Sequence, residues 1–456
     1  MMLTFILRHK VLSLFILLLI GLAIFTAVRW RVWFHNPSED PYVAGSEPRW
    51  VLLTFGNDGE LSRNVSWMCG DEVRESSLEL IDIEKADTTV VSATGEVFES
   101  RSGKAAYYHA RLNDLRHDAT YAYRVITDHH NSPWYSFQTY DEHRSRFSFL
   151  FVGDVQDTIG GRSNIMLKEA IRRNPQSEFI VCGGDLTERP ACQYWEETFR
   201  DIDSIAQHMP LLSVTGNHDY LKGVINSLER RYPLIFSYFL ESKIDDNMVY
   251  TLTYGDAQFF LLDSNREFFY LFSQQSWLEE QLEASTAKWK IVVVHHPLYS
   301  IKDNNLIQKW IFNDLIKEHD VDLVLQGHEH AYARRTMKDD SGKPTTPVYT
   351  ISHCSPKNYL IDFDDEFDKF GISSRYYQLV NIKDDTMSLA TYDANTSQLY
   401  DSLDIIKHYD NLSIIDHGKH IKENMSYTVN PSSSKSLRFK QRIDDYKRRH
   451  PERVGE

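Results

Sequence analysis

Two histidines separated by a single residue stand directly after an apolar run in the stretch VDLVLQGHEHAY, residues 321–332. The run predicts a strand buried on both faces of an α/β core, and open α/β sheets bind ligands in the loops at the carboxyl ends of such strands. Residues two apart in an extended chain point the same way, so His328 and His330 are expected to face one point. Imidazole is the commonest metal ligand, but this pair alone is a weak signal for a metal site.

Further apolar stretches also end in side chains of the kinds that bind metal ions. Carboxylate, amide and imidazole groups together suit Mn, Fe or Zn, and a glycine before most of these positions lets the backbone turn sharply off its strand. Taken singly, each Asp or Asn is equally well explained as a turn or helix cap. Their recurrence at successive strand ends favours a metal site instead. The residues are Asp154 in GDVQD, Asp185 in GGDLTE, Asn217 and His218 in GNHDY, and His295 in VVVHHPLY.

The elements that must position these residues alternate between strands and helices. From Arg146, apolar segments such as FSFLFVGD, SEFIVCGGD and KWKIVVVHH are separated in places by amphipathic stretches such as NIMLKEAIRRN. This alternation predicts an α/β domain over residues 146–407. Residues 47–140 instead contain short strand-like segments with turns between them, which predicts a β-sandwich of immunoglobulin size. Within that region LRHDATYAYRV resembles the corner of a fibronectin type III domain.

The N-terminal segment has a different character. Residues 11–28 are continuously apolar and about long enough to cross a bilayer as a helix, with basic residues on both sides that leave its orientation open. A cleaved signal peptide, with a small-x-small site at residues 21–23, is the alternative. We favour an uncleaved anchor, because the apolar run continues past that site. Residues 1–31 are thus predicted to be a membrane anchor or signal segment and residues 32–46 a linker. The rest is expected outside the cytoplasm, periplasmic or extracellular, and secreted if the segment is cleaved.

Composition excludes several classes of protein. The chain has 456 residues, a formal net charge of −15, and 42% hydrophobic and 25% charged residues. The length indicates more than one domain, and the acidic balance argues against a nucleic-acid partner. The 4 cysteines are too few and too scattered for a disulfide framework or a thiolate zinc site. Residues 408–456 are predicted to be a polar tail, whose basic stretch 435–453 is either a solvated helix or disordered.

The ordered motifs GD, GD, GNHD, H-x-P and GHxH resemble those of the calcineurin-like metallophosphoesterases. The stretch GHEHAYAR, together with a preceding fibronectin-like domain that ends in YSFQT, resembles the purple acid phosphatase branch. The resemblance covers residues 47–407. It implies a four-layer αββα sandwich that follows the transmembrane helix and the all-β sandwich along the chain. The α/β domain is expected to hold two divalent metal ions (Mn, Zn or Fe).

The resemblance also implies a role for each matching residue. The expected metal ligands are Asp185 as the bridge between the ions, Asp154 and His330 at the first ion, and Asn217, His295 and His328 at the second.

Four neighbouring residues receive supporting or catalytic roles from the same resemblance and motifs. His218 is expected beside the substrate phosphate as hydrogen-bond donor and general acid, with Asp219 as its partner. His296 is expected either in the core or behind the ligands, and Tyr332 behind the ligands.

Two departures from the purple branch affect the first ion. That branch has an iron-binding tyrosine three residues after the bridging aspartate, where this chain has Glu188. The broader family has Asp-x-His at its first motif, where this chain has Asp154-Val155-Gln156. Gln156 or Glu188 is the candidate to supply the missing oxygen, so the identity of the first metal is left open.

The predicted function is that of an exported, metal-dependent phosphoric ester hydrolase, resembling an acid phosphatase, that cleaves phosphate monoesters with a metal-bound hydroxide. One alternative is a phosphodiesterase for nucleotides or phospholipid head groups. An alternative of another class is a binding or scaffold protein with a degenerate metal site. The expected partners are a small phosphoester and, through the N-terminal helix, a membrane.

Overall fold

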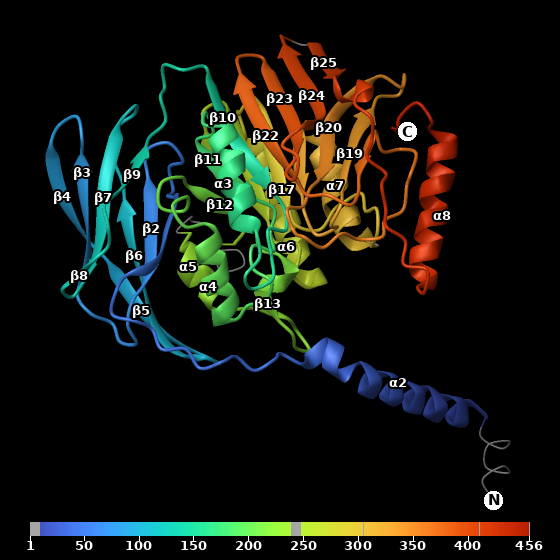
Figure 1. Ribbon diagram of the computed structural model, residues 1–456, viewed down its shortest axis with the longest axis horizontal. Helices are drawn as coiled ribbons and strands as arrows, with labels where there is room; N and C mark the ends of the chain where they lie inside the picture. Colours follow the sequence, from blue (N-terminus) through green and yellow to red (C-terminus); the bar gives the residue numbers. More distant parts are fainter. Residues whose placement is uncertain (1–9, 239–247, 304, 410, 456) are drawn as a thin grey trace, which may run out of the picture.

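The computed structural model describes residues 10–238, 248–303, 305–409 and 411–455. Over these residues the chain forms an N-terminal helix, an all-β sandwich and a larger α/β sandwich (Figure 1). The predicted order of an apolar helix, a β-sandwich and an α/β domain is therefore confirmed. The first nine residues of the predicted anchor lie outside the described part of the chain.

Two sheets pack against each other in the all-β domain, and Trp67 and Tyr123 lie in their shared core. The backbone N–H of Arg116 donates to the hydroxyl of Tyr121 at 3.0 Å, which is the tyrosine corner of fibronectin-like domains. One sheet contains β1 (Arg49–Phe55), β2 (Arg63–Met68), β6 (Gly103–Leu112) and β5 (Thr94–Ser100). The other contains β4 (Asp87–Ser92), β3 (Ser76–Asp82), β7 (Thr120–Thr127), β8 (His130–Asn131) and β9 (Tyr135–Gln138).

The α/β domain contains two seven-stranded sheets and the small hairpin β13 (Tyr220–Leu221) and β14 (Ser227–Leu228). The first sheet runs β12 (Leu211–Ser213), β11 (Phe179–Cys182), β10 (Arg146–Val152), β22 (Tyr376–Lys383), β23 (Thr386–Asp393), β24 (Leu399–His408) and β25 (Asn411–Asp416). The second runs β15 (Tyr250–Tyr254), β16 (Ala257–Leu262), β17 (Trp289–Val294), β18 (Leu323–Gln326), β20 (Pro344–Ile351), β19 (Tyr332–Lys338) and β21 (Lys369–Gly371).

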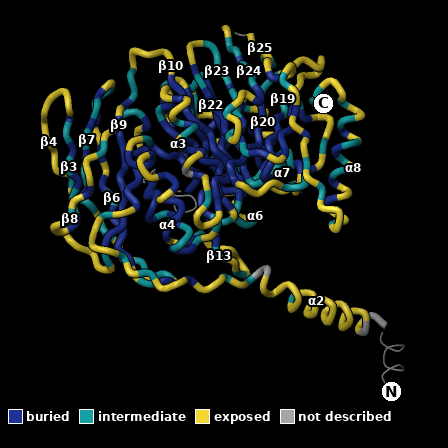
Figure 2. The backbone as a smooth tube through the Cα atoms, in the orientation of Figure 1, coloured by how far each residue is buried: buried dark blue, intermediate teal, exposed yellow. Residues whose placement is uncertain are grey.

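The two large sheets pack face to face through aromatic side chains. Phe149 and Phe179 of the first sheet contact Phe259 of the second, with ring centroids 5.3 and 5.7 Å apart. Figure 2 shows the buried chain concentrated in this interior. Helices α3 (Ser163–Arg173), α4 (Cys192–Asp201) and α5 (Arg231–Phe236) contribute to the same core, and α6 (Phe268–Ala284) and α7 (Leu306–Glu318) cover the outer face of the second sheet.

Parallel strands in both sheets direct their carboxyl ends toward one edge of the domain. In the first sheet β10, β11 and β12 are parallel, and in the second β16, β17, β18 and β20 are parallel. Their central positions are buried, which explains the near-continuous apolar runs in the sequence. The polar residues that follow these runs are thereby brought to the same edge.

The C-terminal region differs from the predicted solvated or disordered tail. Strand β25 extends the first sheet beyond residue 407, the short helix η3 (Gly418–His420) follows, and α8 (Ser434–Arg449) packs on the domain. Phe439, Ile443 and Tyr446 of α8 are buried in one apolar cluster. Their spacing of four and three residues forms one helical face, which the many basic residues of the stretch obscure in the sequence.

The predicted linker is also bound to the folded domains through a buried side chain. Glu39 is buried, and its carboxylate pairs with Arg231 at 2.7 Å and Arg101 at 3.0 Å. It also accepts a hydrogen bond from the backbone N–H of Cys192 at 2.9 Å. Arg101 belongs to the loop between β5 and β6 and Arg231 to α5, so this single carboxylate joins the linker to both domains.

Replacing Glu39 by glutamine is expected to lower the free energy of unfolding at pH 7 by about 3 kcal/mol, because it leaves part of a buried charge uncompensated. Arg231 keeps Glu229 at 3.0 Å, which limits the loss. Burial raises the pKa of Glu39, but the Arg231 and Cys192 hydrogen bonds outweigh it and hold this pKa below the ordinary 4.5. The stabilisation is therefore complete above pH 4.5 and is lost as the pH falls below it.

Denaturant unfolding of wild type and Glu39→Gln across this pH range measures the effect. Glu99→Gln is the matched control, because Glu99 and Lys104 are both exposed and 3.8 Å apart, and such pairs contribute about 0–1 kcal/mol. Equal stabilities of wild type and Glu39→Gln at pH 7 would contradict the role given to this carboxylate.

Helix α2 (Lys10–Phe34) projects from the folded body (Figure 1). Its segment Leu14–Arg31 is long and apolar enough to cross a membrane, and none of it is buried against the rest of the described chain. A signal sequence near an N-terminus has the same character.

Candidate metal centre

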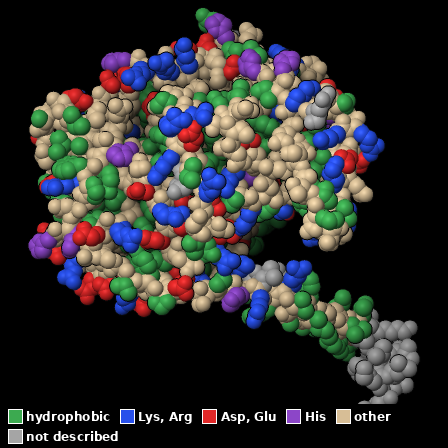
Figure 3. Space-filling view, viewed as in Figure 1, with side chains coloured by type: hydrophobic (Ala, Val, Ile, Leu, Met, Phe, Trp, Pro, Cys, Tyr) green, Lys and Arg blue, Asp and Glu red, His purple; other side chains and the backbone are tan. Residues whose placement is uncertain are grey.

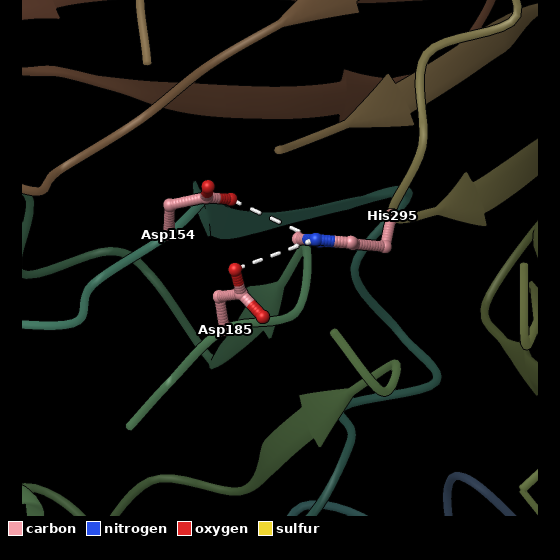
Figure 4. A group of neighbouring side chains, drawn as sticks. All are labelled: Asp154, Asp185 and His295. Carbon is pink, nitrogen blue, oxygen red and sulfur yellow. Dashed lines mark ion pairs between the residues drawn. The ribbon is translucent and has the colours of Figure 1, made fainter. Parts of the chain in front are cut away.

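Asp154, Asp185 and His295 converge from the ends of β10, β11 and β17 (Figure 4). Their ligand atoms lie within 4.8 Å of one another, and all three side chains are buried. The nearest pair is His295 Nε2 and Asp185 Oδ2, at 3.5 Å. These groups come from both sheets, so the shared edge predicted from the strand ends exists in the fold.

A second set of side chains gathers around the same point. Asn217 Oδ1 lies 3.1 Å from His295 Nε2 and 2.9 Å from His328 Nδ1. On the other side, His330 Nε2 lies 2.9 Å from Asp154 Oδ2. The six expected ligands therefore form one cluster, with an Asn217, His295 and His328 group and an Asp154 and His330 group, as the proposed division between two ions requires.

Hydrogen bonds fix which ring nitrogen faces the centre. His295 Nδ1 lies 2.8 Å from the carbonyl oxygen of Gly183, and His330 Nδ1 lies 3.1 Å from that of Lys357. Each Nδ1–H donates outward, which leaves the Nε2 lone pair directed inward. His328 is reversed, because its Nε2 lies 3.3 Å from Asp303 Oδ2 and its Nδ1 faces Asn217. These are the outward contacts that orient metal-binding histidines.

The Asp154 and His330 pair fits a cation. With Nδ1 facing the Lys357 carbonyl, His330 presents Nε2 both to Asp154 Oδ2 at 2.9 Å and to the Gln156 amide nitrogen at 3.1 Å, and Asp154 Oδ2 has no hydrogen-bond donor among the described residues. Two lone pairs in contact in a buried place are unfavourable unless a positive charge lies between them. The chemistry of this donor set, carboxylate and imidazole, matches Mn, Fe or Zn.

The backbone at the centre is bent sharply to bring these groups together. Asp154, Asp185 and His328 have left-handed φ values of 43°, 50° and 69°, which is costly for residues other than glycine and typical of functional sites. Glycine is also required beside them. A Cβ at Gly216 would lie 2.0 Å from Asp185 Oδ1, and one at Gly327 would lie 2.5 Å from Asp154 Oδ1.

His218 is held with one nitrogen toward the centre. Its Nδ1 lies 2.5 Å from the carbonyl oxygen of Glu188, and its Nε2 lies 3.9 Å from Asp185 Oδ2. The expected pairing with Asp219 is not formed. Asp219 Oδ2 instead accepts from the backbone N–H of Gly216 at 2.7 Å, because the tight turn η1 (Asn217–Asp219) folds this side chain back on its own start.

The two candidates for the extra ligand at the first ion lie in different places. Gln156 is buried, and its Nε2 is 3.1 Å from His330 Nε2, which puts its amide beside the first-ion residues. The side chain of Glu188 instead pairs with Lys357 at 2.5 Å. Gln156 Oε1 has no hydrogen-bond partner among the described residues, so Gln156 is better placed than Glu188 to supply an additional oxygen.

His296 and Tyr332 also have defined places. The His296 ring packs on His328, with centroids 4.3 Å apart, and its Nδ1 lies 2.9 Å from the Ser264 hydroxyl. Tyr332 is fully buried and donates to Asp401 at 2.8 Å. His296 therefore supports a ligand ring directly, whereas the Tyr332 hydroxyl fastens β19 to β24.

Sequence reasoning missed three residues that touch the site. Asp303 orients His328, Lys357 contributes its carbonyl to His330 and its ammonium to Glu188, and the Tyr359 ring stacks on His330 with centroids 4.2 Å apart. All three stand in loops, in SIKDNN and SHCSPKNYL, without apolar periodicity. The only signal in the sequence was the presence of charged and aromatic residues in the loops that follow β17 and β20.

Comparisons with known proteins agree with this architecture. Residues 147–332 match the calcineurin-like phosphoesterase family, and residues 48–139 match the purple acid phosphatase N-terminal domain. In the solved purple acid phosphatase PPD1 from yellow lupin the fold is similar, with a TM-score of 0.68 at 16% identity over 80% of this chain and 75% of that one.

Two curated relatives are distant in sequence. A phosphoenolpyruvate phosphatase of Allium cepa is 24% identical over 318 residues, which are 63% of this chain and 63% of that protein. The Fe(3+)-Zn(2+) purple acid phosphatase 12 of Arabidopsis thaliana is 21% identical over 311 residues, which are 63% of this chain and 65% of that protein. The chain thus spans somewhat less than two thirds of the length of these relatives.

The fold and the ligand-bearing strand ends define a metallophosphoesterase domain of the calcineurin-like class. With the domain that precedes it, the chain is similar to the purple acid phosphatases in both of its folded domains. That group uses a binuclear centre of Fe, Zn or Mn, and this chain carries candidate ligands for one.

Proposed function

We propose that this protein is an exported, membrane-anchored phosphoesterase that hydrolyses phosphate monoesters with a pair of divalent ions. The observation that carries the proposal is the convergence of the six candidate ligands at one edge of the α/β domain, four of them buried. Within it, His330 Nε2 faces Asp154 Oδ2 at 2.9 Å. Two such ions, when bound, polarise the phosphate and supply the nucleophilic water.

The protein's own groups account for the remaining requirements. Phosphoryl transfer needs positioning and charge stabilisation rather than covalent chemistry from side chains. Neutral Asn217 and three imidazoles keep the centre cationic, which suits an anionic substrate. His218 Nε2 faces the centre while Nδ1 is held by Glu188, so the ring is oriented to donate a proton to the leaving oxygen.

The substrate has room beside this histidine. Asn217 and His218 line a cavity of about 410 Å³ that is also lined by basic side chains. The position of His218 favours catalysis over the scaffold alternative, because a metal site with a purely structural role has no need of a histidine aimed at the space beside it. The cavity also leaves the phosphodiesterase alternative open.

The test uses the full chain purified in mild detergent. Elemental analysis is expected to find two ions per chain, and an aryl phosphate monoester is expected to be hydrolysed faster than the corresponding diester. Faster diester hydrolysis would favour the phosphodiesterase. A protein without metal and without either activity would favour the scaffold.

The metal-replete protein is expected to be colourless, because no tyrosine in the described part of the chain is placed to bind ferric iron as in the purple branch. Position 188 is a glutamate paired with Lys357, and the Tyr220 hydroxyl is engaged by Asp263. The ring of Tyr359 lies beside His330, but burial raises the pKa of Tyr359, which disfavours its phenolate. Divalent Mn, Zn or ferrous iron are the expected ions.

A visible spectrum beside the elemental analysis checks this expectation. A purple band that disappears in Tyr194→Phe or Tyr220→Phe would overturn it. Glu188→Tyr is the converse variant, since it restores the phenolate and is expected to introduce colour when ferric iron is supplied.

A further inference from the structure

Six large apolar side chains lie exposed on the edge of the α/β domain that holds the metal centre. Val224 is 91% exposed, Phe269 82% and Trp310 63%, which is unusual for side chains of this size on a soluble surface. We call this set the apolar rim. It consists of Val224, Ile225, Phe268, Phe269, Leu306 and Trp310.

The apolar rim is built from three segments that contact one another in turn. The backbone N–H of Asn226 donates to Glu267 at 3.0 Å, which joins the loop of Val224 and Ile225 to the start of α6. Phe268 of α6 stacks on Trp310 of α7, with centroids 6.1 Å apart and ring planes 8° from parallel. One hairpin turn and the first turns of two helices therefore present their apolar residues together.

The rim adjoins the metal centre because both use the same strand ends. The hairpin β13–β14, which carries Val224 and Ile225 in its turn, begins directly after Asn217 and His218. The start of α6 is tied to the same place, since Asn265 Nδ2 donates to the carbonyl oxygen of Thr215 at 2.9 Å. The rim thus borders the opening of the candidate site.

The membrane helix ends beside the rim. Asn36 exchanges two hydrogen bonds of 2.8 Å with the backbone of Lys222, two residues before Val224. Only His35 separates Asn36 from the end of α2 at Phe34, a span of about 7 Å at most. Figure 1 shows α2 leaving the body on the side of α6 and β13.

Basic groups lie in the same region. The cavity beside His218 is lined by Arg31 and His35 from the end of α2 and the linker, and by Arg101, Arg189 and Lys222. Blue side chains are visible at the junction of the body and α2 in Figure 3. Aromatic residues with neighbouring basic ones are typical of protein surfaces that contact the head-group layer.

We propose that the apolar rim rests in the surface of the bilayer that holds α2, so that the metal centre faces membrane lipids and acts on phosphate monoesters carried by them. The substrate class rests on the proposed function. In the reaction, water adds its oxygen to phosphorus and the bond from phosphorus to the lipid alcohol oxygen breaks. That oxygen takes a proton, which yields inorganic phosphate and the neutral lipid alcohol.

The depth of the rim tests the docking without reference to activity. The four native cysteines are buried and unpaired, so a cysteine at position 269 can be labelled selectively with an environment-sensitive fluorophore. The labelled Phe269→Cys variant of the full chain is reconstituted into anionic phospholipid vesicles. Its fluorescence emission is expected to shift to the blue and to be quenched by nitroxide-labelled lipid. Val90→Cys is the control, because Val90 is 64% exposed on β4 of the other domain.

Substrate preference gives a second measurement. In the same vesicles, Phe269→Ser with Trp310→Ser is expected to lower the ratio of phosphatidic acid hydrolysis to aryl phosphate hydrolysis by about tenfold, whereas Val90→Ser with Leu399→Ser leaves the ratio unchanged.

The outcomes separate this inference from the proposed function. A protein that hydrolyses aryl phosphate while its position 269 label stays as exposed to water as that at position 90 overturns the docking alone. A protein that hydrolyses neither substrate overturns the proposed function, and the label still reports where the rim lies. An unchanged ratio in the double variant overturns the assignment of lipid phosphates as substrates.

Discussion

Asp185→Asn is expected to lose both metal ions and to reduce hydrolysis to background. The Asp185 carboxylate is the proposed anion shared by the two ions. It lies 3.5 Å from His295 and also accepts the backbone N–H of His218 at 2.8 Å. An amide has the same shape as a carboxylate but no charge. The variant therefore lacks the negative charge that would offset the repulsion between two neighbouring ions.

Elemental analysis beside an aryl phosphate assay measures both losses. Asp322→Asn is the matched control, because Asp322 is an equally buried carboxylate that pairs with Lys407 at the opposite end of β18. This control is expected to lose stability and to keep its ions. If Asp185→Asn retains both ions and most of its activity, the ligand assignment is wrong.

His218→Ala is expected to fold and bind metal while kcat falls by roughly 10²–10⁴-fold, the usual contribution of a general acid. The carbonyl of Glu188 holds Nδ1, so Nε2 is the nitrogen directed at the substrate. The loss should grow as the leaving group becomes more basic, because poor leaving groups depend most on proton donation.

A series of aryl and alkyl phosphates with His218→Asn as the companion variant separates two roles. Asparagine keeps a hydrogen-bond donor for the phosphate but cannot transfer a proton at neutral pH. If the loss is no larger for poor leaving groups than for good ones, His218 is not the acid and acts in binding.

The candidate ligands could be predicted from the sequence because each follows an apolar strand, and parallel strands deliver their carboxyl ends to one edge. Asp154 and His330 are 176 positions apart along the chain, yet this rule alone brings them together. The strand period does not explain the pairing of His328 with His330, because β18 ends at Gln326 and His328 has a left-handed φ of 69°; the two rings reach the centre from a bend, one toward Asn217 and the other toward Asp154.

Contacts that depend on loop conformation could not be predicted. Asp219 was expected from the family resemblance to pair with His218, but a three-residue turn directs it to Gly216. Asp303 and Lys357 reach the centre from irregular loops, whose paths no periodicity encodes. The buried face of α8 was present in the sequence as Phe439, Ile443 and Tyr446, but the charge of the intervening residues outweighed it in the interpretation.

The short tie at Asn36 has a kinetic consequence for an anchor embedded in a bilayer. An enzyme on a long stalk sweeps a large volume and can reach a second membrane opposite its own. Here only His35 lies between the end of α2 and the contact that Asn36 makes with the body, so the catalytic edge cannot swing outward. Enzyme and substrate would then meet by lateral diffusion within one leaflet. The rate would follow the mole fraction of substrate in that leaflet rather than its bulk concentration, and dilution with inert lipid would slow turnover.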